Sequence, residues 1–231
     1  MRRGREIVLL VFLFVSTLAN AQVGNLRSTL SIGANGGVSL SRMDIVPSLR
    51  QTFNMGKTFG ATLRYTSEKY FFLICGAQLE ANYVERGWKE LIEDGTGDEY
   101  SRQVSYVEIP FLCHLGIGRE FYGVQGFLNI GPQIGFLLSD KEIKSGNWTD
   151  LSGRPASSGY TYGKKFEKTF EYGIAGGLGI ELKTRAGSFS LEGRYYYGLS
   201  DVFGNKKSDP FARSANSSII AKLGWTIDLI R

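Results

Sequence analysis

Apolar and polar side chains alternate with a period of two through most of this 231-residue chain. In the first such segment, Leu30, Ile32 and Val38 occupy even positions, whereas the odd positions from 31 to 39 carry only Ser, Gly and Asn. Successive side chains of a β-strand point to opposite faces, so this pattern predicts a strand with one apolar and one polar face.

The same alternation recurs in seven further segments, which makes eight predicted strands. They cover residues 30–40, 59–65, 73–83, 107–115, 122–136, 170–182, 189–199 and 219–229. Short connections at residues 66–70, 116–121 and 183–188 alternate with long, polar ones at residues 41–58, 87–100, 139–169 and 200–218. Short turns at one end and long loops at the other are typical of an outer-membrane barrel. The sequence therefore predicts an all-β fold, an eight-stranded antiparallel up-and-down transmembrane β-barrel with short periplasmic turns and longer extracellular loops.

Side-chain size and charge decide which face of these strands points outward. One face carries large apolar residues such as Phe111 and Leu223, and the other carries glycine and most of the charged residues. The interior of an eight-stranded barrel is only wide enough for side chains to fill it, so the aromatic face would overfill it. In a bilayer the apolar face meets hydrocarbon, and glycine leaves room for charged pairs inside. We therefore expect the apolar face to point outward.

Charged residues on the predicted inner face form the first candidate site. They are Arg64, Glu80, Glu108, Glu181, Glu192, Arg194 and Lys222. Four acidic and three basic side chains are close to balance, and unpaired charges inside a membrane are costly. We expect a structural network of ion pairs that closes the lumen, rather than an ion pathway or a catalytic site.

The first 21 residues differ from the rest of the chain. A cationic start at residues 2–5 precedes an apolar run over residues 7–18 and the small-x-small pattern Ala19-Asn20-Ala21. The run is shorter than the roughly 20 residues of a membrane-spanning helix. We therefore predict a cleaved secretory signal peptide at residues 1–21 and a single barrel domain at residues 22–231. Export and the predicted barrel together indicate the outer membrane of a Gram-negative cell, in contact with outer-membrane lipid.

Composition and single residues exclude several other functions. Lys and Arg number 27 against 22 Asp and Glu, and loss of three Arg and one Glu with residues 1–21 leaves 24 against 21. This excess is too small to indicate a nucleic-acid partner. The acidic stretch at residues 93–99 has the Asp and Gly of an ordinary hairpin turn, so we expect no metal there. His114, the only histidine, lacks a serine or carboxylate partner in the pattern, so we expect no catalytic residue, no cofactor and no enzyme activity.

Five short segments carry a resemblance to a known family. They are Gln78-Leu79-Glu80-Ala81-Asn82-Tyr83, Tyr106-Val107-Glu108-Ile109-Pro110, Gly131-Pro132, Gly176-Gly177-Leu178-Gly179-Ile180-Glu181 and Tyr197-Gly198-Leu199. In their order and spacing the chain resembles the PorT-like small outer-membrane β-barrels over essentially its whole length after residue 21. The resemblance implies a barrel without catalytic residues. The namesake of that family is linked to a protein secretion pathway, so the resemblance also implies partners in a secretion or envelope assembly.

The longest predicted loop supplies the second set of candidate residues. Trp148, Tyr160 and Tyr162 lie in it and are expected to contact a partner, because loops on a rigid scaffold commonly carry binding residues. Two alternatives stay open: an outer-membrane lipid-modifying enzyme, and a soluble periplasmic barrel that binds a small apolar ligand. The sequence leaves the partner, the physiological role and the oligomeric state open.

The relative position of the two cysteines depends on the register of one predicted hairpin. If residues 73–83 and 107–115 pair about residue 94, facing positions sum to 188 and Cys75 faces Cys113. A disulfide between adjacent strands is strained, so we expect two unpaired, lipid-facing thiols.

Overall fold

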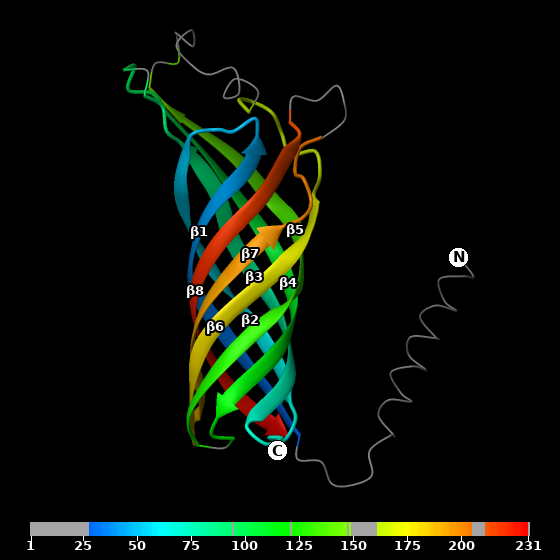
Figure 1. Ribbon diagram of the computed structural model, residues 1–231. Helices are drawn as coiled ribbons and strands as arrows, with labels where there is room; N and C mark the ends of the chain where they lie inside the picture. Colours follow the sequence, from blue (N-terminus) through cyan, green and yellow to red (C-terminus); the bar gives the residue numbers. More distant parts are fainter. Residues whose placement is uncertain are drawn as a thin grey trace, which may run out of the picture.

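The computed structural model describes residues 28–93, 95–120, 122–146, 148, 161–204 and 211–230. The strands in this part of the chain are β1 (Thr29–Val46), β2 (Gln51–Thr66), β3 (Leu73–Glu90), β4 (Glu99–Gly118), β5 (Gly123–Ser145), β6 (Phe170–Thr184), β7 (Gly187–Gly198) and β8 (Arg213–Ile230). Consecutive strands are antiparallel, and pairing of β1 with β8 closes the sheet into a barrel (Figure 1). The predicted fold class is confirmed, whereas the predicted signal peptide lies outside the described residues.

The two ends of the barrel differ in their connections. The end that we call the turn end has the short connections, at residues 67–72, 119–122 and 185–186, and β1 begins and β8 ends there (Figure 1). The opposite end, the loop end, has the connections at residues 47–50, 91–98, 146–169 and 199–212. In the described residues no helix is long and apolar enough to cross a membrane.

The outer wall carries an apolar band around the barrel. On β3 and β4 this band covers residues 73–83 and 107–117, which matches the 9–11 or so residues that a tilted strand needs to cross a bilayer. The side chains of Phe59, Phe111 and Leu223 in this band are 57%, 56% and 66% exposed. Most inward residues at the same level are polar and buried, with a small apolar cluster of Leu112, Ala175 and Tyr196 among them. The predicted orientation of the two faces is therefore confirmed.

Beyond this band, at the loop end, the two faces of the wall exchange their character. On β1, Met43 and Ile45 point inward and are buried, whereas Arg42 and Asp44 lie on the outer face. The outer face meets water there, so burial of apolar side chains again favours the interior. The strands consequently run further than predicted, and the expected loops at residues 41–58, 87–100, 139–169 and 200–218 are too long.

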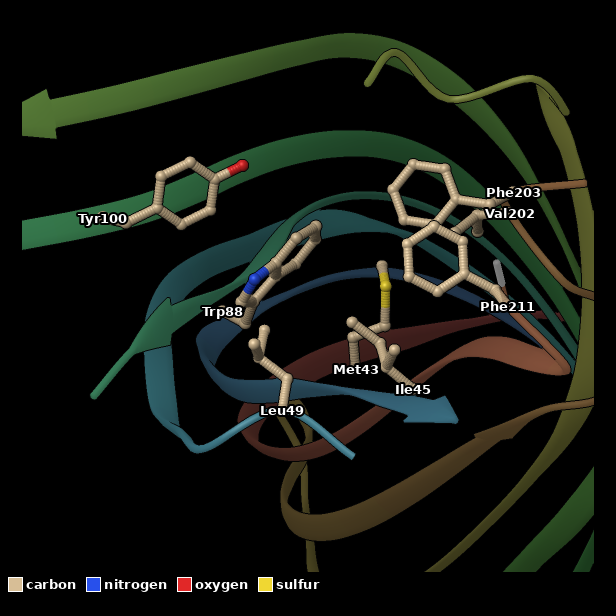
Figure 2. Close-up of a cluster of buried hydrophobic side chains, with 8 residues drawn as sticks. All are labelled: Met43, Ile45, Leu49, Trp88, Tyr100, Val202, Phe203 and Phe211. Atoms are coloured by element: carbon tan, nitrogen blue, oxygen red, sulfur yellow. The ribbon is translucent and has the colours of Figure 1, made fainter. Parts of the chain in front are cut away.

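Buried apolar side chains fill the barrel at the loop end (Figure 2). This apolar cap consists of Met43, Ile45, Leu49, Trp88, Tyr100, Val202, Phe203 and Phe211. Phe166 stacks on Trp88 with ring centroids 6.3 Å apart, and Phe203 stacks on Phe211 at 5.1 Å. Full burial of such a side chain contributes roughly 1.5–3 kcal/mol. The cap is therefore a hydrophobic core of the kind found in water-soluble proteins.

Loop residues also complete the barrel wall. β5 continues for nine residues beyond Phe136, which pairs with Phe170 at the start of β6. The backbone of Val202 fills part of the resulting gap: its N–H donates to Ser214 O at 2.8 Å, and its carbonyl accepts from Glu167 N at 3.1 Å. The loops after β5 and β7 are thus held in the wall by sheet-like hydrogen bonds.

The register of the β3–β4 hairpin differs from the predicted one. Cys75 faces Leu115, and Cys113 faces Ala77, so facing positions sum to 190. The prediction of a direct Cys75–Cys113 pair is wrong, because the pairing is centred one residue later than residue 94. Both thiols are free and exposed on the outer wall.

Candidate functional site

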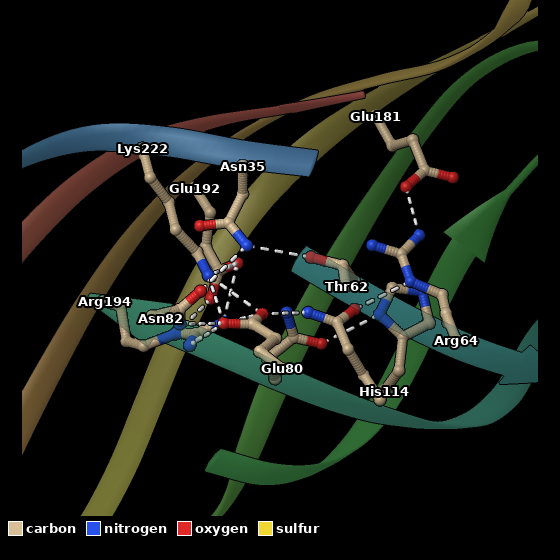
Figure 3. Close-up of polar contacts among 12 residues, drawn as sticks. Asn35, Thr62, Arg64, Glu80, Asn82, His114, Glu181, Glu192, Arg194 and Lys222 are labelled. Atoms are coloured by element: carbon tan, nitrogen blue, oxygen red, sulfur yellow. Dashed lines mark hydrogen bonds and ion pairs between the residues drawn. The ribbon is translucent and has the colours of Figure 1, made fainter. Parts of the chain in front are cut away.

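A central cluster of four charged side chains crosses the middle of the lumen (Figure 3). It consists of Glu80 on β3, Glu192 and Arg194 on β7, and Lys222 on β8. Glu80 accepts hydrogen bonds from Arg194 at 2.8 and 2.9 Å and from Lys222 at 2.7 and 2.8 Å. Arg194 also donates to Glu192, at 2.7 and 3.0 Å. Two acids and two bases therefore neutralise one another inside the barrel.

Glycine on β6 makes room for this cluster. A Cβ atom at Gly177 would lie 2.6 Å from Glu192 Oε1, closer than two such atoms can approach. Steric crowding thus explains why this inner-face position is glycine, because a larger residue there would displace the Glu192 carboxylate from Arg194.

A lower cluster lies nearer the turn end. Arg64 on β2 pairs through Nη1 with Glu181 on β6 and donates through Nε to Gln78 Oε1 at 2.7 Å. Lys183 Nζ lies 3.9 Å from the other oxygen of Glu181. The side chains of Arg64 and Glu181 are only 7% and 1% exposed.

An upper cluster lies between the central cluster and the apolar cap. Arg86 on β3, which is fully buried, donates to Glu171 Oε1 at 2.6 Å and pairs with Glu108. Gln133 donates to the second carboxylate oxygen of Glu108 at 2.8 Å. Asn216 donates to the second carboxylate oxygen of Glu171 at 2.6 Å. One arginine thus holds two carboxylates, whose remaining lone pairs are met by amides.

All seven predicted inner-face charges lie in the lumen, but they divide among these three clusters. Sequence reasoning missed Arg86, the partner of Glu108, and left Glu171 out of the network. The signal for Arg86 is present in the sequence, since every second residue from Glu80 onward points inward. The predicted strand ends at Tyr83, where the apolar outer face stops, three residues before Arg86.

The central cluster leaves little space in the middle of the barrel. A cavity of about 10 Å³ remains beside Glu80 and Lys222, which is room for roughly one water molecule. The apolar cap fills the lumen above the upper cluster. The described residues therefore form a closed barrel rather than a pore.

A further ion pair lies among the rings that pack on the apolar cap. Arg102 on β4 donates to Asp140 on β5 at 2.6 Å and lies 4.9 Å from the ring centre of Phe166 and 5.7 Å from that of Trp88. Burial opposes the charge of Arg102, but the hydrogen bonds and charge of Asp140 outweigh it and raise the pKa of the guanidinium. Arg102 is therefore a permanent cation that links β4 and β5 to the loop residues.

The candidate residues of the longest loop lie against the cap. Trp148 and Tyr162 are half-buried, with their ring centroids 5.1 Å apart, and both pack on Tyr100. Lys144 Nζ lies 5.2 Å from the ring centre of Trp148, and the Tyr162 hydroxyl donates to Glu90 at 2.9 Å. Tyr160 lies outside the described residues. Trp148 and Tyr162 thus form one group of packed rings with Tyr100.

His114 is packed in the lumen. It is 1% exposed, and its Nδ1 lies 2.8 Å from Asn129 Oδ1. In the acidic stretch at residues 93–99, Glu93 pairs with Arg50 at 2.8 Å and Glu99, the first residue of β4, pairs with Lys89 at 3.2 Å. Within the part of the chain that the structure describes, no three His, Cys, Asp or Glu side chains are grouped as metal ligands.

A closed antiparallel barrel with an apolar outer band and a charged, neutralised lumen defines an outer-membrane β-barrel protein. The profile of the family described as outer membrane protein beta-barrel domain matches residues 20–204. The chain belongs to this family. The protein lies in the outer membrane, with its turn end toward the periplasm and its loop end outside the cell. The alternative of a soluble periplasmic barrel is therefore not retained.

Solved structures of other outer-membrane barrels resemble this one distantly. The attachment invasion locus protein Ail of Yersinia pestis is 12% identical, covers 85% of this chain and 98% of its own, and gives a TM-score of 0.36. The N-terminal β-barrel domain of Pseudomonas aeruginosa OprF is 10% identical. The match covers 88% of this chain and 100% of the OprF domain, with a TM-score of 0.40. The outer membrane enzyme PagL is 11% identical. The match covers 86% of this chain and 98% of PagL, with a TM-score of 0.40. No curated protein matches the chain.

Replacing the buried arginine of the upper cluster tests its role. We expect Arg86→Met to lower the free energy of unfolding by about 3–5 kcal/mol, because two carboxylates are left without their cation. Denaturant unfolding in lipid bilayers, followed by tryptophan fluorescence, measures this change. Arg50→Met, which removes an exposed pair, should cost less than about 1 kcal/mol. Equal, small losses in the two variants would contradict the assigned role.

A closed lumen predicts an electrical property. The folded protein in a planar bilayer should show no large, steady conductance, because the clusters and the apolar cap leave no continuous water path. Folding of the sample is checked by the shift in gel mobility between boiled and unboiled protein. A steady porin-like current from folded protein would show that the lumen is open.

Proposed function

We propose that this protein is a non-catalytic outer-membrane barrel whose loop end binds a partner protein. The closed lumen is the observation that supports this proposal most directly. The three charge clusters and the apolar cap fill the interior, so solutes have no path through the barrel. A surface function at the exposed end then accounts best for the long loops.

Packed aromatic side chains form the base of the longest loop. Trp148 and Tyr162 pack on Tyr100, which is itself buried in the cap. The described residues that flank positions 149–160 therefore belong to a rigid platform. Binding segments are commonly held by a rigid scaffold in this way. Tyr160 belongs to this segment, and we assign it to partner contact.

Secretion or envelope assembly is the context that we propose. It follows from the resemblance to PorT-like barrels carried by segments such as Tyr106–Pro110 and Tyr197–Leu199. In the same proposal, residues 1–21 are a cleaved signal peptide and residues 22–231 form one barrel domain.

A lipid-modifying activity has less support. Such an enzyme needs a nucleophile and a base near the bilayer surface, where its substrate lies. His114 is buried inside the lumen against Asn129. We therefore assign no catalytic residue to this chain.

Replacement of residues 149–160 with a Gly-Ser segment of equal length tests the proposal. Trp148 and Tyr162 stay in place, so the platform and the barrel should remain folded. Cross-linking in intact cells, followed by mass spectrometry, should find an envelope protein bound to the wild type and lost from this variant. The matched control replaces residues 205–210 in the same way and should keep the partner. Unchanged capture by the variant lacking residues 149–160 would contradict the proposal.

A further inference from the structure

A polar pocket of about 350 Å³ opens at the turn end of the barrel. Its walls come from the ends of β1, β2, β3, β6, β7 and β8 and from the three turns that join β2 to β3, β4 to β5 and β6 to β7. Above it the central cluster closes the lumen, where the remaining cavity is only about 10 Å³. The pocket is therefore blind. It opens to the periplasm, at the opposite end from the loops of the proposed function.

The floor of the pocket contains a guanidinium nitrogen for which no hydrogen bond to a described residue is present. Arg64 and Glu181 line the pocket with side chains that are 7% and 1% exposed. Arg64 uses Nε for Gln78 and Nη1 for Glu181, and within the described residues its Nη2 makes no hydrogen bond. A guanidinium nitrogen in a buried, polar site is a strong donor to an anionic oxygen.

Charge around the pocket changes from its floor to its rim. At the floor, Arg64 and Lys183 outnumber Glu181 by one positive charge, and Lys183 Nζ reaches toward the rim, where it donates to Glu120 O at 3.1 Å. The rim carries Arg185 and the two acids Glu120 and Asp228, of which Asp228 is exposed. An elongated ligand therefore meets a positive floor and carboxylates at the entrance. This arrangement favours a molecule with an anionic end and a cationic or N–H-rich end.

Hydroxyl groups line the wall between the floor and the rim. Thr66, Ser188 and Thr226 are at most 9% exposed, and their hydroxyls make no hydrogen bond to any described residue. Each hydroxyl can both donate and accept. Such a wall matches the alternating N–H and C=O groups of a peptide.

We propose that this pocket binds a short peptide that enters with its carboxylate end. Arg64 Nη2 and Lys183 take the carboxylate, the three hydroxyls take the peptide groups, and Glu120 and Asp228 face the amino side. A phosphate group fits less well, because its second negative charge would lie close to Glu181. The singly charged carboxylate is the group that the floor accommodates.

A carboxylate of this kind has two sources in the periplasm. One is a free short peptide, which also carries an amino group. The other is the C-terminus of a periplasmic protein, which presents only the carboxylate. Both share the same recognition at the floor, and they differ at the rim.

Three peptides distinguish these sources. Triglycine, N-acetyl-triglycine and triglycinamide are added, at up to the order of 10 mM, to the folded, isotope-labelled protein in lipid nanodiscs. The NMR signals of the Arg64 guanidinium and of Lys183, Ser188 and Thr226 are followed. Triglycine should shift these signals saturably, and triglycinamide should not. Equal binding of N-acetyl-triglycine assigns the site to protein C-termini, whereas loss of its binding assigns the site to free peptides.

Two variants separate this pocket from a general charge effect. Lys183→Gln should weaken triglycine binding by about tenfold, since one charged hydrogen bond is lost. Arg119→Gln removes an exposed cation from the neighbouring turn, outside the pocket, and should leave binding unchanged. The shift in gel mobility on boiling confirms that each variant is folded.

The proposal is overturned by any of three results. These are the absence of a saturable shift with triglycine, equal binding of triglycine and triglycinamide, or equal weakening by Lys183→Gln and Arg119→Gln.

Discussion

Backbone hydrogen bonds that close a ring are the constraint on which the rest of this structure depends. A strand in lipid has no water to satisfy its N–H and C=O groups, so an open sheet edge is excluded there. Pairing of β1 with β8 removes both edges. Once the sheet is a closed cylinder, every residue of the membrane-spanning part has to face either acyl chains or a narrow lumen. The period-two pattern of the sequence follows from this choice.

The narrow lumen then determines the chemistry of the inner face. Charged side chains fit only where glycine leaves room, and they persist only where each meets an opposite charge. The central, upper and lower clusters satisfy this condition with arginine and lysine from four strands, β2, β3, β7 and β8, together with Lys183 from β6. The neutralised interior blocks passage through the barrel and leaves its two ends as the surfaces available for recognition.

Much of the fold could be predicted because lipid imposes a simple rule on the sequence. Apolar residues outside and polar residues inside are the opposite of a soluble barrel, and the eight segments that obey this rule were found. The rule fails where strands leave the bilayer. Met43 and Trp88 point inward and Arg42 outward because the surrounding solvent has changed, and the sequence alone does not mark the level of this change. The strand ends, Arg86 and the apolar cap were missed for this one reason.

Other features depend on details that strand patterns do not contain. The register of the β3–β4 hairpin is set by how many residues the connection uses, so an error of one residue in its centre moved Cys75 and Cys113 out of opposition. The pocket at the turn end depends on which side chains of six strands meet across the lumen. Pairing across a barrel is a three-dimensional property, and the individual strands do not reveal it.

A nitroxide scan along β4 tests the central claim most directly. Spin labels are placed one at a time from residue 107 to residue 114, in a background without native cysteines, and the accessibility of each label to oxygen is measured in bilayers. The account predicts a period of two, with maxima at Val107, Ile109, Phe111 and Cys113, where side chains face acyl chains. Maxima at Glu108, Leu112 and His114 would mean that the charged face meets lipid, and would contradict the account.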